Sequence, residues 1–415
     1  MRPRSLGFAA VLVIFVLSAA FAWAEIEKGP YLQNVTQNSI EVVWQGSESG
    51  TVDWGVTPNF GRTIDADYDL ITDMNHAELT GLTAETLYYY QVDCDGEIKT
   101  GTFITAPEPG TPFVFAVSGD TRTDHTMHRA MAERILGDGI PDMYFNTGDL
   151  VEWAASLDNW ADFFAIEADL MKDSVFWPVM GNHDYEVLTF YDQWFSTGRS
   201  YAFNYGNAKF IVLNTDGFYF KNSSQYNMLK SELEKAANDP DLQFKFVFFH
   251  KPGVTSGSHA PDQTIVNDYL DLFEQFDVDV VFNGHNHIYE HGLVNGVHYL
   301  VTGGGGVGVS GTLEIRDWTV YAQSVNHYCR IEVEPDRYTV TVIDVNGNVI
   351  DAFTETTAGG GFPGPTPPDL TNTGCGAATP NEHGPDKEDR AANLATMISP
   401  LAVVLILRKK KNSRN

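Results

Sequence analysis

The sequence predicts a small all-β sandwich followed by a larger α/β domain of layered sheets and helices. Two patterns lead to this prediction: short alternating apolar and polar runs fill residues 25–108, and apolar strands alternate with amphipathic helices in residues 109–355. The chain has only 3 Cys in 415 residues. Hydrophobic cores rather than disulfides must therefore stabilise the folds, and the chain is long enough to supply them.

The first region alternates in the way expected of antiparallel strands. Ser39 to Trp44 and Tyr88 to Val92 are typical runs, and turns rich in Gly, Asn, Asp and Thr separate them. A short region organised in this way indicates a β-sandwich. No group of chemically reactive residues stands out in it, so we expect packing or substrate shaping from this region rather than catalysis.

The second region repeats the order strand, helix, strand. Its strands are apolar along their length, which indicates a sheet buried on both faces. We expect strands at 113–117, 143–146, 176–180, 210–213, 244–249, 278–282 and 299–302, and helices near 125–136 and 159–171. Two late strands, 328–333 and 338–343, precede an Asn-Gly turn, and they predict a second sheet that closes a β-sandwich.

The charged residues are unevenly distributed along the chain. There are 26 Lys and Arg against 55 Asp and Glu, for a net charge of -29. Seven of the basic residues lie in 1–24 and 391–415, where no acidic residue occurs, so residues 25–390 hold 19 basic and 55 acidic residues. Such an acidic body repels nucleic-acid polymers and anionic membranes. An anionic substrate must therefore be attracted by a local positive centre.

The N-terminal segment has the features of a secretory signal peptide. Arg2 and Arg4 precede an apolar run from Leu6 to Ala22, and Ala22-Trp23-Ala24 offers the small residues of a cleavage site. We expect residues 1–24 to be removed, with retention as an anchor as the alternative. The rest of the chain is then expected outside the cytoplasmic membrane, secreted or at the cell envelope.

The C-terminal segment has the features of a sorting tail. Residues 356–390 form a Gly/Pro-rich and polar linker, and residues 391–415 hold an apolar stretch followed by the basic cluster Arg408 to Lys411. The stretch is at the short limit for spanning a bilayer. This layout resembles the tripartite C-terminal sorting signals of bacterial surface proteins. We expect membrane contact only through this tail, and recognition by sorting or processing machinery; Cys375 is either the processing point or a linker cysteine without a role.

Polar side chains follow five of the expected strands, at the point where each strand ends. They are Gly119-Asp120, Gly148-Asp149, Gly181-Asn182-His183, His250 and Gly284-His285-Asn286-His287. Because ligands bind beyond the carboxyl ends of strands in open α/β sheets, we expect these side chains to meet at a single edge. The glycines give the backbone room to turn sharply.

This mixture of ligands indicates a metal site. Carboxylate, amide and imidazole groups together suit divalent or ferric ions, and a carboxylate shared by two ions makes a dinuclear centre. A Gly-Asp pair alone is usually a turn, and a lone strand-end histidine is usually structural. All five groups in order favour a binding site for two metal ions.

The order of these groups resembles the motif order of the calcineurin-like metallophosphoesterases. Val278 to Glu290 is similar to the purple acid phosphatase branch, and Gly29 to Asn34 resembles the start of its fibronectin-type-III-like leader. The resemblance covers about residues 29–355. It implies a metallophosphoesterase β-sandwich flanked by helices in α/β/β/α layers, preceded by a fibronectin-III-like sandwich.

The resemblance also implies a ligand set and a proton donor. His183 is expected to donate a hydrogen bond to the phosphoryl group or the leaving oxygen. The neighbouring Asp184 either orients the His183 ring or forms an exposed salt bridge. One metal ion is expected at Asp120, Asp149 and His287, and the other at Asp149, Asn182, His250 and His285, with Asp149 bridging.

Two positions depart from the family pattern. Purple acid phosphatases have a tyrosine three residues after the bridging aspartate, where this chain has Glu152, so we expect no tyrosinate colour. The wider superfamily has a histidine ligand two residues after the first aspartate, where this chain has Arg122. Glu152 or water could complete the first metal site. Arg122 either binds a phosphate oxygen or pairs with a neighbouring carboxylate.

The function that the resemblance implies is hydrolysis of small phosphate monoesters by metal-activated hydroxide, in an acid phosphatase-like enzyme. The expected cofactors are two divalent or ferric/divalent ions of iron, manganese or zinc. A phosphodiesterase or nucleotidase could use the same residues, because pocket loops decide between these substrates. A further alternative is a surface protein that binds metal without turnover.

Overall fold

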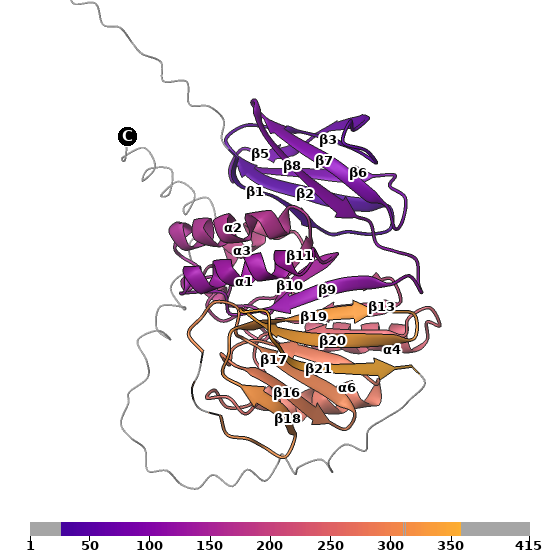
Figure 1. The fold of residues 1–415 in the computed structure, drawn as a ribbon, viewed down its shortest axis with the longest axis vertical. Helices are drawn as coiled ribbons and strands as arrows, with labels where there is room; N and C mark the ends of the chain where they lie inside the picture. Colours follow the sequence, from indigo (N-terminus) through magenta and orange to yellow (C-terminus); the bar gives the residue numbers. More distant parts are fainter. Residues whose placement is uncertain (1–25, 310, 312, 358–415) are drawn as a thin grey trace, which may run out of the picture.

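The computed structural model describes residues 26–309, 311 and 313–357 (Figure 1). The predicted signal segment, nearly all of the linker, Cys375 and the apolar C-terminal tail lie outside these residues. Within them, no helix is long and apolar enough to cross a membrane.

The N-terminal region is a sandwich of two antiparallel sheets, drawn in indigo in Figure 1. Its residues alternate between buried and exposed, as in β7, where alternate positions pack on the core. One sheet contains β1 (Ile26–Gln33), β2 (Ser39–Gly46), β6 (Met74–Thr80) and β5 (Asp67–Asp69). The other contains β4 (Arg62–Asp65), β3 (Thr51–Gly55), β7 (Leu87–Cys94) and β8 (Glu97–Ile104).

The larger region contains two packed sheets. In the first, three parallel strands are β9 (Phe113–Ser118), β10 (Met143–Asn146) and β11 (Val175–Pro178), and β19 (His327–Val333), β20 (Arg337–Asp344) and β21 (Val349–Thr356) extend it beyond β9. In the second, the order is β12 (Tyr201–Tyr205), β13 (Ala208–Val212), β14 (Phe244–Phe248), β15 (Val280–Asn283), β17 (Val297–Thr302), β16 (Tyr289–Val294) and β18 (Thr319–Gln323).

The late strands were expected to form the second sheet, and this expectation is wrong. β19 pairs antiparallel with β9, so the late strands widen the first sheet instead. The second sheet begins earlier in the chain, at β12 and β13. Strand periodicity shows which face of a strand is buried but not which neighbour it pairs with, so the sequence pattern could not assign the late strands.

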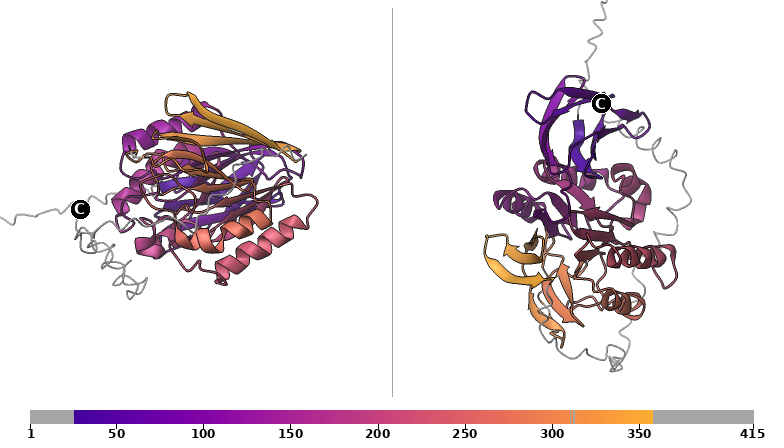
Figure 2. Two further views of the ribbon diagram at one scale, coloured as in Figure 1. Left: turned by 90° about the horizontal axis from the view of Figure 1, so that it is seen from below. Right: turned by 90° about the vertical axis from the view of Figure 1, so that its right-hand side faces the viewer.

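Helices cover the outer faces of both sheets, which gives the expected α/β/β/α layers (Figure 2). On the first sheet lie α1 (His125–Gly137), α2 (Leu157–Met171), the short 3-10 helix Tyr185–Val187 and α3 (Leu188–Trp194). On the second lie α4 (Ser224–Ala237), α5 (Gln263–Asp268) and α6 (Leu270–Gln275). Capping defines where α1 begins, because the Asp124 side chain accepts hydrogen bonds from the N–H groups of Thr126 and Met127.

Aromatic side chains fill the space between the two sheets. The rings of Phe145 and Phe248 stack at 4.2 Å between centroids, and those of Phe248 and Phe282 at 4.9 Å. Each of these side chains is fully buried, which stabilises the fold by roughly 1.5–3 kcal/mol per residue. Three strands, one from the first sheet and two from the second, are therefore fixed to one another just beneath the expected site.

The two regions share a continuous sheet. β1 pairs in parallel with β11, with Leu32 opposite Val175, so one ten-stranded sheet contains strands of both regions. Side chains reinforce this junction: Asp173 accepts hydrogen bonds from the N–H and hydroxyl of Thr102 at 2.6 and 2.9 Å. The predicted division at residue 108 falls in the connection between β8 and β9, while backbone pairing crosses from one region to the other elsewhere.

Candidate metal centre

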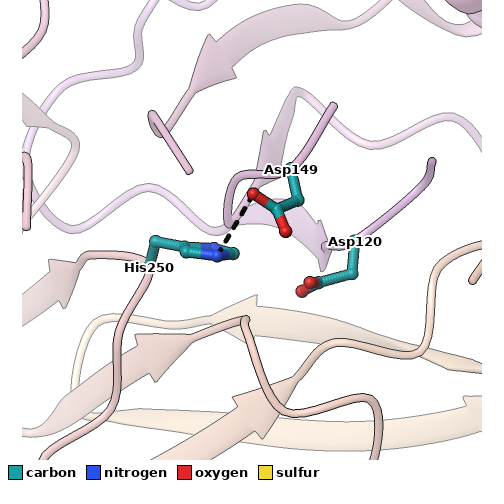
Figure 3. Close-up of side chains that lie close together, drawn as sticks. All are labelled: Asp120, Asp149 and His250. Carbon is teal, nitrogen blue, oxygen red and sulfur yellow. Dashed lines mark ion pairs between the residues drawn. The ribbon is translucent and has the colours of Figure 1, made fainter. Parts of the chain in front are cut away.

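The polar residues singled out in the sequence lie where strands of both sheets end. Asp120 and Asp149 follow β9 and β10 of the first sheet, and His250 follows β14 of the second. Ligand atoms of these three residues lie within 4.8 Å of one another. The site therefore sits where the edges of two sheets meet, rather than at the single sheet edge expected from the sequence (Figure 3).

The backbone at the site adopts unusual conformations. Asp120, Asp149 and His285 have φ values of 54°, 55° and 69°, in the left-handed region that residues other than glycine rarely occupy. Such conformations cost on the order of 1–2 kcal/mol each and persist where the surroundings require them. Here they turn three side chains back toward a common point.

Two glycines allow the strand ends to approach closely. A Cβ on Gly284 would lie 2.5 Å from Oδ2 of Asp120 and 3.0 Å from Nδ1 of His250. Gly148 has a φ of 103°, and a Cβ there would lie 2.7 Å from Nδ1 of His250. The two glycines therefore leave room for the carboxylate of Asp120 and the ring of His250.

The Asp149 carboxylate is at the centre of the group. Its Oδ1 accepts a hydrogen bond from the backbone N–H of His183 at 3.0 Å and lies 3.3 Å from Nε2 of His250. Its Oδ2 accepts from Nε of Arg122 at 3.2 Å. Burial raises the pKa of Asp149, but the attraction and hydrogen bonds of His250 and His183 lower it by more. The pKa is therefore well below the usual value. Asp149 is therefore an anion in the protein interior.

The orientation of the His250 ring is set by Thr147. Nδ1 of His250 lies 2.9 Å from the Thr147 carbonyl oxygen, which can only accept a hydrogen bond, so Nδ1 carries the proton. Nε2 then faces Oδ1 of Asn182 at 3.2 Å and Oδ1 of Asp149 at 3.3 Å. Burial lowers the pKa of His250, but Asp149 raises it more, to about 10. At neutral pH, Nε2 of His250 therefore carries a proton that faces the two oxygens, and a metal ion bound here would replace that proton.

Among the described residues, one oxygen of the Asp120 carboxylate accepts a hydrogen bond and the other does not. Oδ2 accepts a hydrogen bond from the backbone N–H of His285 at 2.9 Å. Oδ1 is buried and has no hydrogen-bond partner within the described residues. Burial raises the pKa of Asp120 to about 7, despite the attraction of His250. A buried carboxylate oxygen without a donor is a ready ligand for a cation.

The remaining expected ligands surround this group. Nε2 of His287 lies 3.6 Å from Oδ1 of Asp120, and the His285 ring packs at 5.1 Å from the His250 ring. Burial lowers the pKa of His287 to about 4, so this ring is neutral and its lone pair is available as an acceptor. His259, which lies outside the motifs singled out in the sequence, has its ring centroid 4.3 Å from that of His285.

His259 reaches the site through Asn286, the middle residue of the Gly-His-Asn-His motif. Oδ1 of Asn286 accepts from the His259 N–H at 2.8 Å, and Nδ2 donates to the His259 carbonyl at 3.1 Å. Both bonds join segments 27 residues apart in the sequence. The Gly-His-Asn-His motif drew attention to Asn286. No pattern in the sequence predicts that the Asn286 side chain binds the loop of His259.

Arg122 pairs with carboxylates of the protein. Besides its bond to Asp149, it forms an ion pair with Glu152, and its Nη2 lies 3.4 Å from Nε2 of His287. The pairing with neighbouring carboxylates that the sequence allowed is therefore present, and binding of a phosphate oxygen stays a prediction. Glu152 is 45% exposed and contacts Arg122, whereas the sequence suggested it as a possible metal ligand.

His183 and Asp184 are not joined in the way the sequence suggested. Nδ1 of His183 donates to the backbone carbonyl of Glu152 at 2.7 Å. Asp184 is fully buried, and its oxygens accept from the N–H groups of Gly181, Leu150 and Val151 at 2.9, 3.0 and 3.4 Å. Asp184 therefore holds the backbone on both sides of the site, and it neither orients the His183 ring nor forms an exposed salt bridge.

The donor set fits a metal ion on the His250 side of Asp149. Nε2 of His250, which would offer a lone pair when a metal ion displaces its proton, converges there with two carboxylates and an amide oxygen, and the buried Oδ1 of Asp120 has no hydrogen-bond partner among the described residues. Hard oxygens with imidazole suit Mn, Fe and Zn ions alike. The residues therefore fit a metal site but do not select the metal.

Comparison with known proteins shows which family this chain resembles. Residues 113–289 match the family Calcineurin-like phosphoesterase. An uncharacterized protein of Mycobacterium tuberculosis is 27% identical over 291 residues, covering 56% of this chain and 55% of its own. A purple acid phosphatase of Glycine max is 26% identical over 265 residues, with the same coverage of 56% and 55%. The chain spans about half the length of these curated relatives.

Solved structures support the same fold. A purple acid phosphatase from yellow lupin seeds aligns with a TM-score of 0.69 at 17% identity, covering 79% of this chain and 74% of its own. A structure of PhoD aligns with a TM-score of 0.60 at 13% identity, covering 82% and 90%. At these identities the alignments establish the architecture, including the N-terminal β region ahead of the layered domain.

Proposed function

We propose that this chain, whose residues 113–289 form a calcineurin-like phosphoesterase domain related to purple acid phosphatases, hydrolyses small phosphate monoesters. The observation that carries the proposal is the convergence of Asp120, Asp149 and His250 at the meeting point of two sheets. Replacing a buried charged group by apolar residues is often neutral or stabilising for the fold, so the presence of this group favours a binding role. It is suited to concentrating positive charge where a phosphate binds.

Metal binding accounts for how an acidic protein attracts an anion. When bound, a metal ion here lowers the pKa of a coordinated water and neutralises charge on the phosphate oxygens. Asp149 and His250 would hold the ion, and the Thr147 carbonyl keeps the His250 lone pair directed at it. The net charge of the chain is -29, so such a local centre is needed for binding.

His183 is the proposed proton donor. Its Nδ1–H is committed to the Glu152 carbonyl, so any proton available to substrate is on Nε2. Nε2 lies 3.9 Å from Oδ2 of Asp149, and the side chain is 25% exposed, which leaves it accessible from solvent. In the charged form, Nε2–H donates to the leaving oxygen as the phosphorus–oxygen bond breaks.

The test is hydrolysis of p-nitrophenyl phosphate and bis(p-nitrophenyl) phosphate by the purified full chain, loaded separately with manganese, zinc and iron. Asn182→Ala removes the amide oxygen beside His250 and should abolish turnover. Asn204→Ala is the matched control, because Asn204 is exposed on β12 and its side chain has no hydrogen bond within the described residues. It should retain full turnover.

The substrates distinguish the alternatives. A higher rate with the monoester supports the phosphatase, whereas a higher rate with the diester shows a phosphodiesterase built on the same residues. Bound metal without hydrolysis of either substrate would contradict both and leave a metal-binding surface protein. Turnover that survives in Asn182→Ala would mean that hydrolysis comes from a contaminant or another site.

We also propose that the chain acts outside the cytoplasmic membrane. The support is the charged and apolar order of residues 1–24 and the apolar and basic order of residues 391–411. Its proposed partners are small phosphate esters and the sorting machinery, without nucleic acid. Cell fractionation with protease treatment of intact cells tests this location: the body should be digested, and protection from protease would place it inside.

A further inference from the structure

The guanidinium of Arg122 contacts Asp149 and His287, two of the three residues that the sequence resemblance implies as ligands of the first metal ion. Nε donates to Oδ2 of Asp149 at 3.2 Å, and Nη2 lies 3.4 Å from Nε2 of His287. Nη1 is paired with Glu152. One cationic side chain therefore bridges Asp149 and Glu152, which follow β10, and His287, which is distant from both in the sequence.

The direction of these hydrogen bonds decides what the ligands can still do. A guanidinium has five N–H donors and no acceptor, so Arg122 is the donor in every contact. Nε2 of His287 has one lone pair, and a lone pair that accepts an N–H cannot bind a metal ion at the same time. His287 is therefore engaged by Arg122, and so is Oδ2 of Asp149.

Charge leads to the same result. The side chain of Arg122 is 13% exposed and that of Asp149 is 2% exposed, so the pair is largely shielded from water. Arg122 already supplies the positive charge that a buried carboxylate requires. A divalent ion placed beside it would add two like charges at contact distance, where screening by solvent is weak.

The other side of Asp149 is free of this arginine. Oδ1 faces His250 at 3.3 Å, and the neighbouring Oδ1 of Asn182 faces the same ring nitrogen at 3.2 Å. Oδ1 of Asp120 remains without a donor within the described residues. The two oxygens of Asp149 therefore face different cation positions. Oδ2 binds the guanidinium, and Oδ1 is directed to the position of an ion on the His250 side.

We infer that Arg122 takes the place of one of the two metal ions, so that the chain binds a single ion at Asp120, Asp149 and His250. The guanidinium is then the second positive centre. Three of its five N–H groups are used by the protein, which leaves one on Nη1 and one on Nη2 for phosphate oxygens. The binding of phosphate oxygens by Arg122 rests on the proposed function. The inference that the chain binds one metal ion does not.

The first experiment counts metal ions. The full chain is loaded with Mn²⁺, dialysed and analysed by mass spectrometry for manganese, with electron paramagnetic resonance as a second readout. We expect one ion per chain and the spectrum of an isolated Mn²⁺. Two ions per chain with a spin-coupled spectrum would overturn the inference, and so would the absence of any bound ion.

The second experiment removes the guanidinium. Arg122→His frees the lone pair of His287, offers an additional imidazole, and is expected to raise the count to two coupled ions per chain. Arg199→His is the matched control, since Arg199 also pairs with a carboxylate, Asp192, but on the surface. It should stay at one ion. A folded Arg122→His protein that still binds one ion would also contradict the inference; should it not fold, the wild-type count decides.

Hydrolysis and metal count are read separately, so the two proposals can fail separately. One ion per chain without hydrolysis would contradict the proposed function and leave Arg122 in the place of a metal ion. Two coupled ions together with hydrolysis would support the proposed function and contradict the inference that Arg122 takes the place of a metal ion. Hydrolysis with a single ion supports both.

Discussion

His327 and Val325 are joined by a hydrogen bond in which the ring Nδ1–H of His327 donates to the Val325 carbonyl oxygen at 2.9 Å. The ring is fully buried, and its Nε2 has no hydrogen-bond partner within the described residues. Burial lowers the pKa of His327 to about 4, because a charged ring would lose hydration that no neighbouring group replaces. The folded protein thus keeps the ring neutral where the unfolded chain protonates it.

Acid should therefore weaken the fold through His327. As pH falls from the ordinary pKa of 6.5 to about 4, only the unfolded chain gains this proton. The free energy of unfolding then drops by roughly 1.4 kcal/mol per pH unit from this group. His327→Asn keeps an N–H for Val325 without titrating, so its slope should be smaller by one proton. Urea unfolding from about pH 4.5 to 7 measures both slopes, and equal slopes would refute the assignment.

Asp184→Ala should destabilise the protein by about 2–3 kcal/mol, because backbone N–H groups of Gly181 and Leu150 would be left buried without an acceptor. Turnover should fall as well, since Asp149 is held next to Leu150. Asp192→Ala removes a surface carboxylate that is 45% exposed and should cost under about 1 kcal/mol. Urea unfolding compares the two variants. Equal stabilities would mean that water replaces the buried acceptor.

Gly284→Ala should weaken metal binding by at least about tenfold, because the added Cβ would come within 2.5 Å of Oδ2 of Asp120 and displace the carboxylate. Gly308→Ala is the control, as no atom lies within 4 Å of a Cβ placed there. Calorimetric titration with Zn²⁺ gives both affinities. An unchanged affinity in Gly284→Ala would show that Asp120 is not a ligand.

His183→Ala should lower kcat by about 10²–10⁴ for phenyl phosphate, which needs a protonated leaving oxygen. The loss should be smaller for p-nitrophenyl phosphate, whose leaving group is the weaker base. His125→Ala provides the comparison, because that side chain is 44% exposed and pairs with Asp162 at 3.5 Å. A loss that is the same for both substrates would assign His183 to binding rather than to proton transfer.

Much of the architecture could be predicted from sequence because burial leaves a periodic signal. The expected strand 143–146 coincides with β10, and the helix expected near 125–136 is α1. Pairing leaves no such signal: the antiparallel contact of Cys329 with Val117 joins residues far apart in the chain. The late strands were therefore found correctly as strands but assigned to the wrong sheet.

The site shows the same division. Asp120, Asp149 and His250 could be recognised from the residue types that follow apolar strands. The partners of Arg122 could not, because Asp149, Glu152 and His287 approach it only in the folded chain. Asp184 was misread for a similar reason, since backbone N–H groups that need an acceptor are invisible in a sequence.

The pairing of β1 with β11 has a consequence for how this protein can be taken apart or recombined. A cut in the connection near residue 108 leaves the ladder between Leu32 and Val175 intact, together with the bonds from Thr102 to Asp173. The N-terminal β region thus continues the first sheet of the larger region and is not a tethered module. If this region were exchanged for that of a relative, the new β1 would have to pair with β11 in the sheet that carries Asp120 and Asp149. Whether the exchange succeeds therefore depends on strand register and not on linker length.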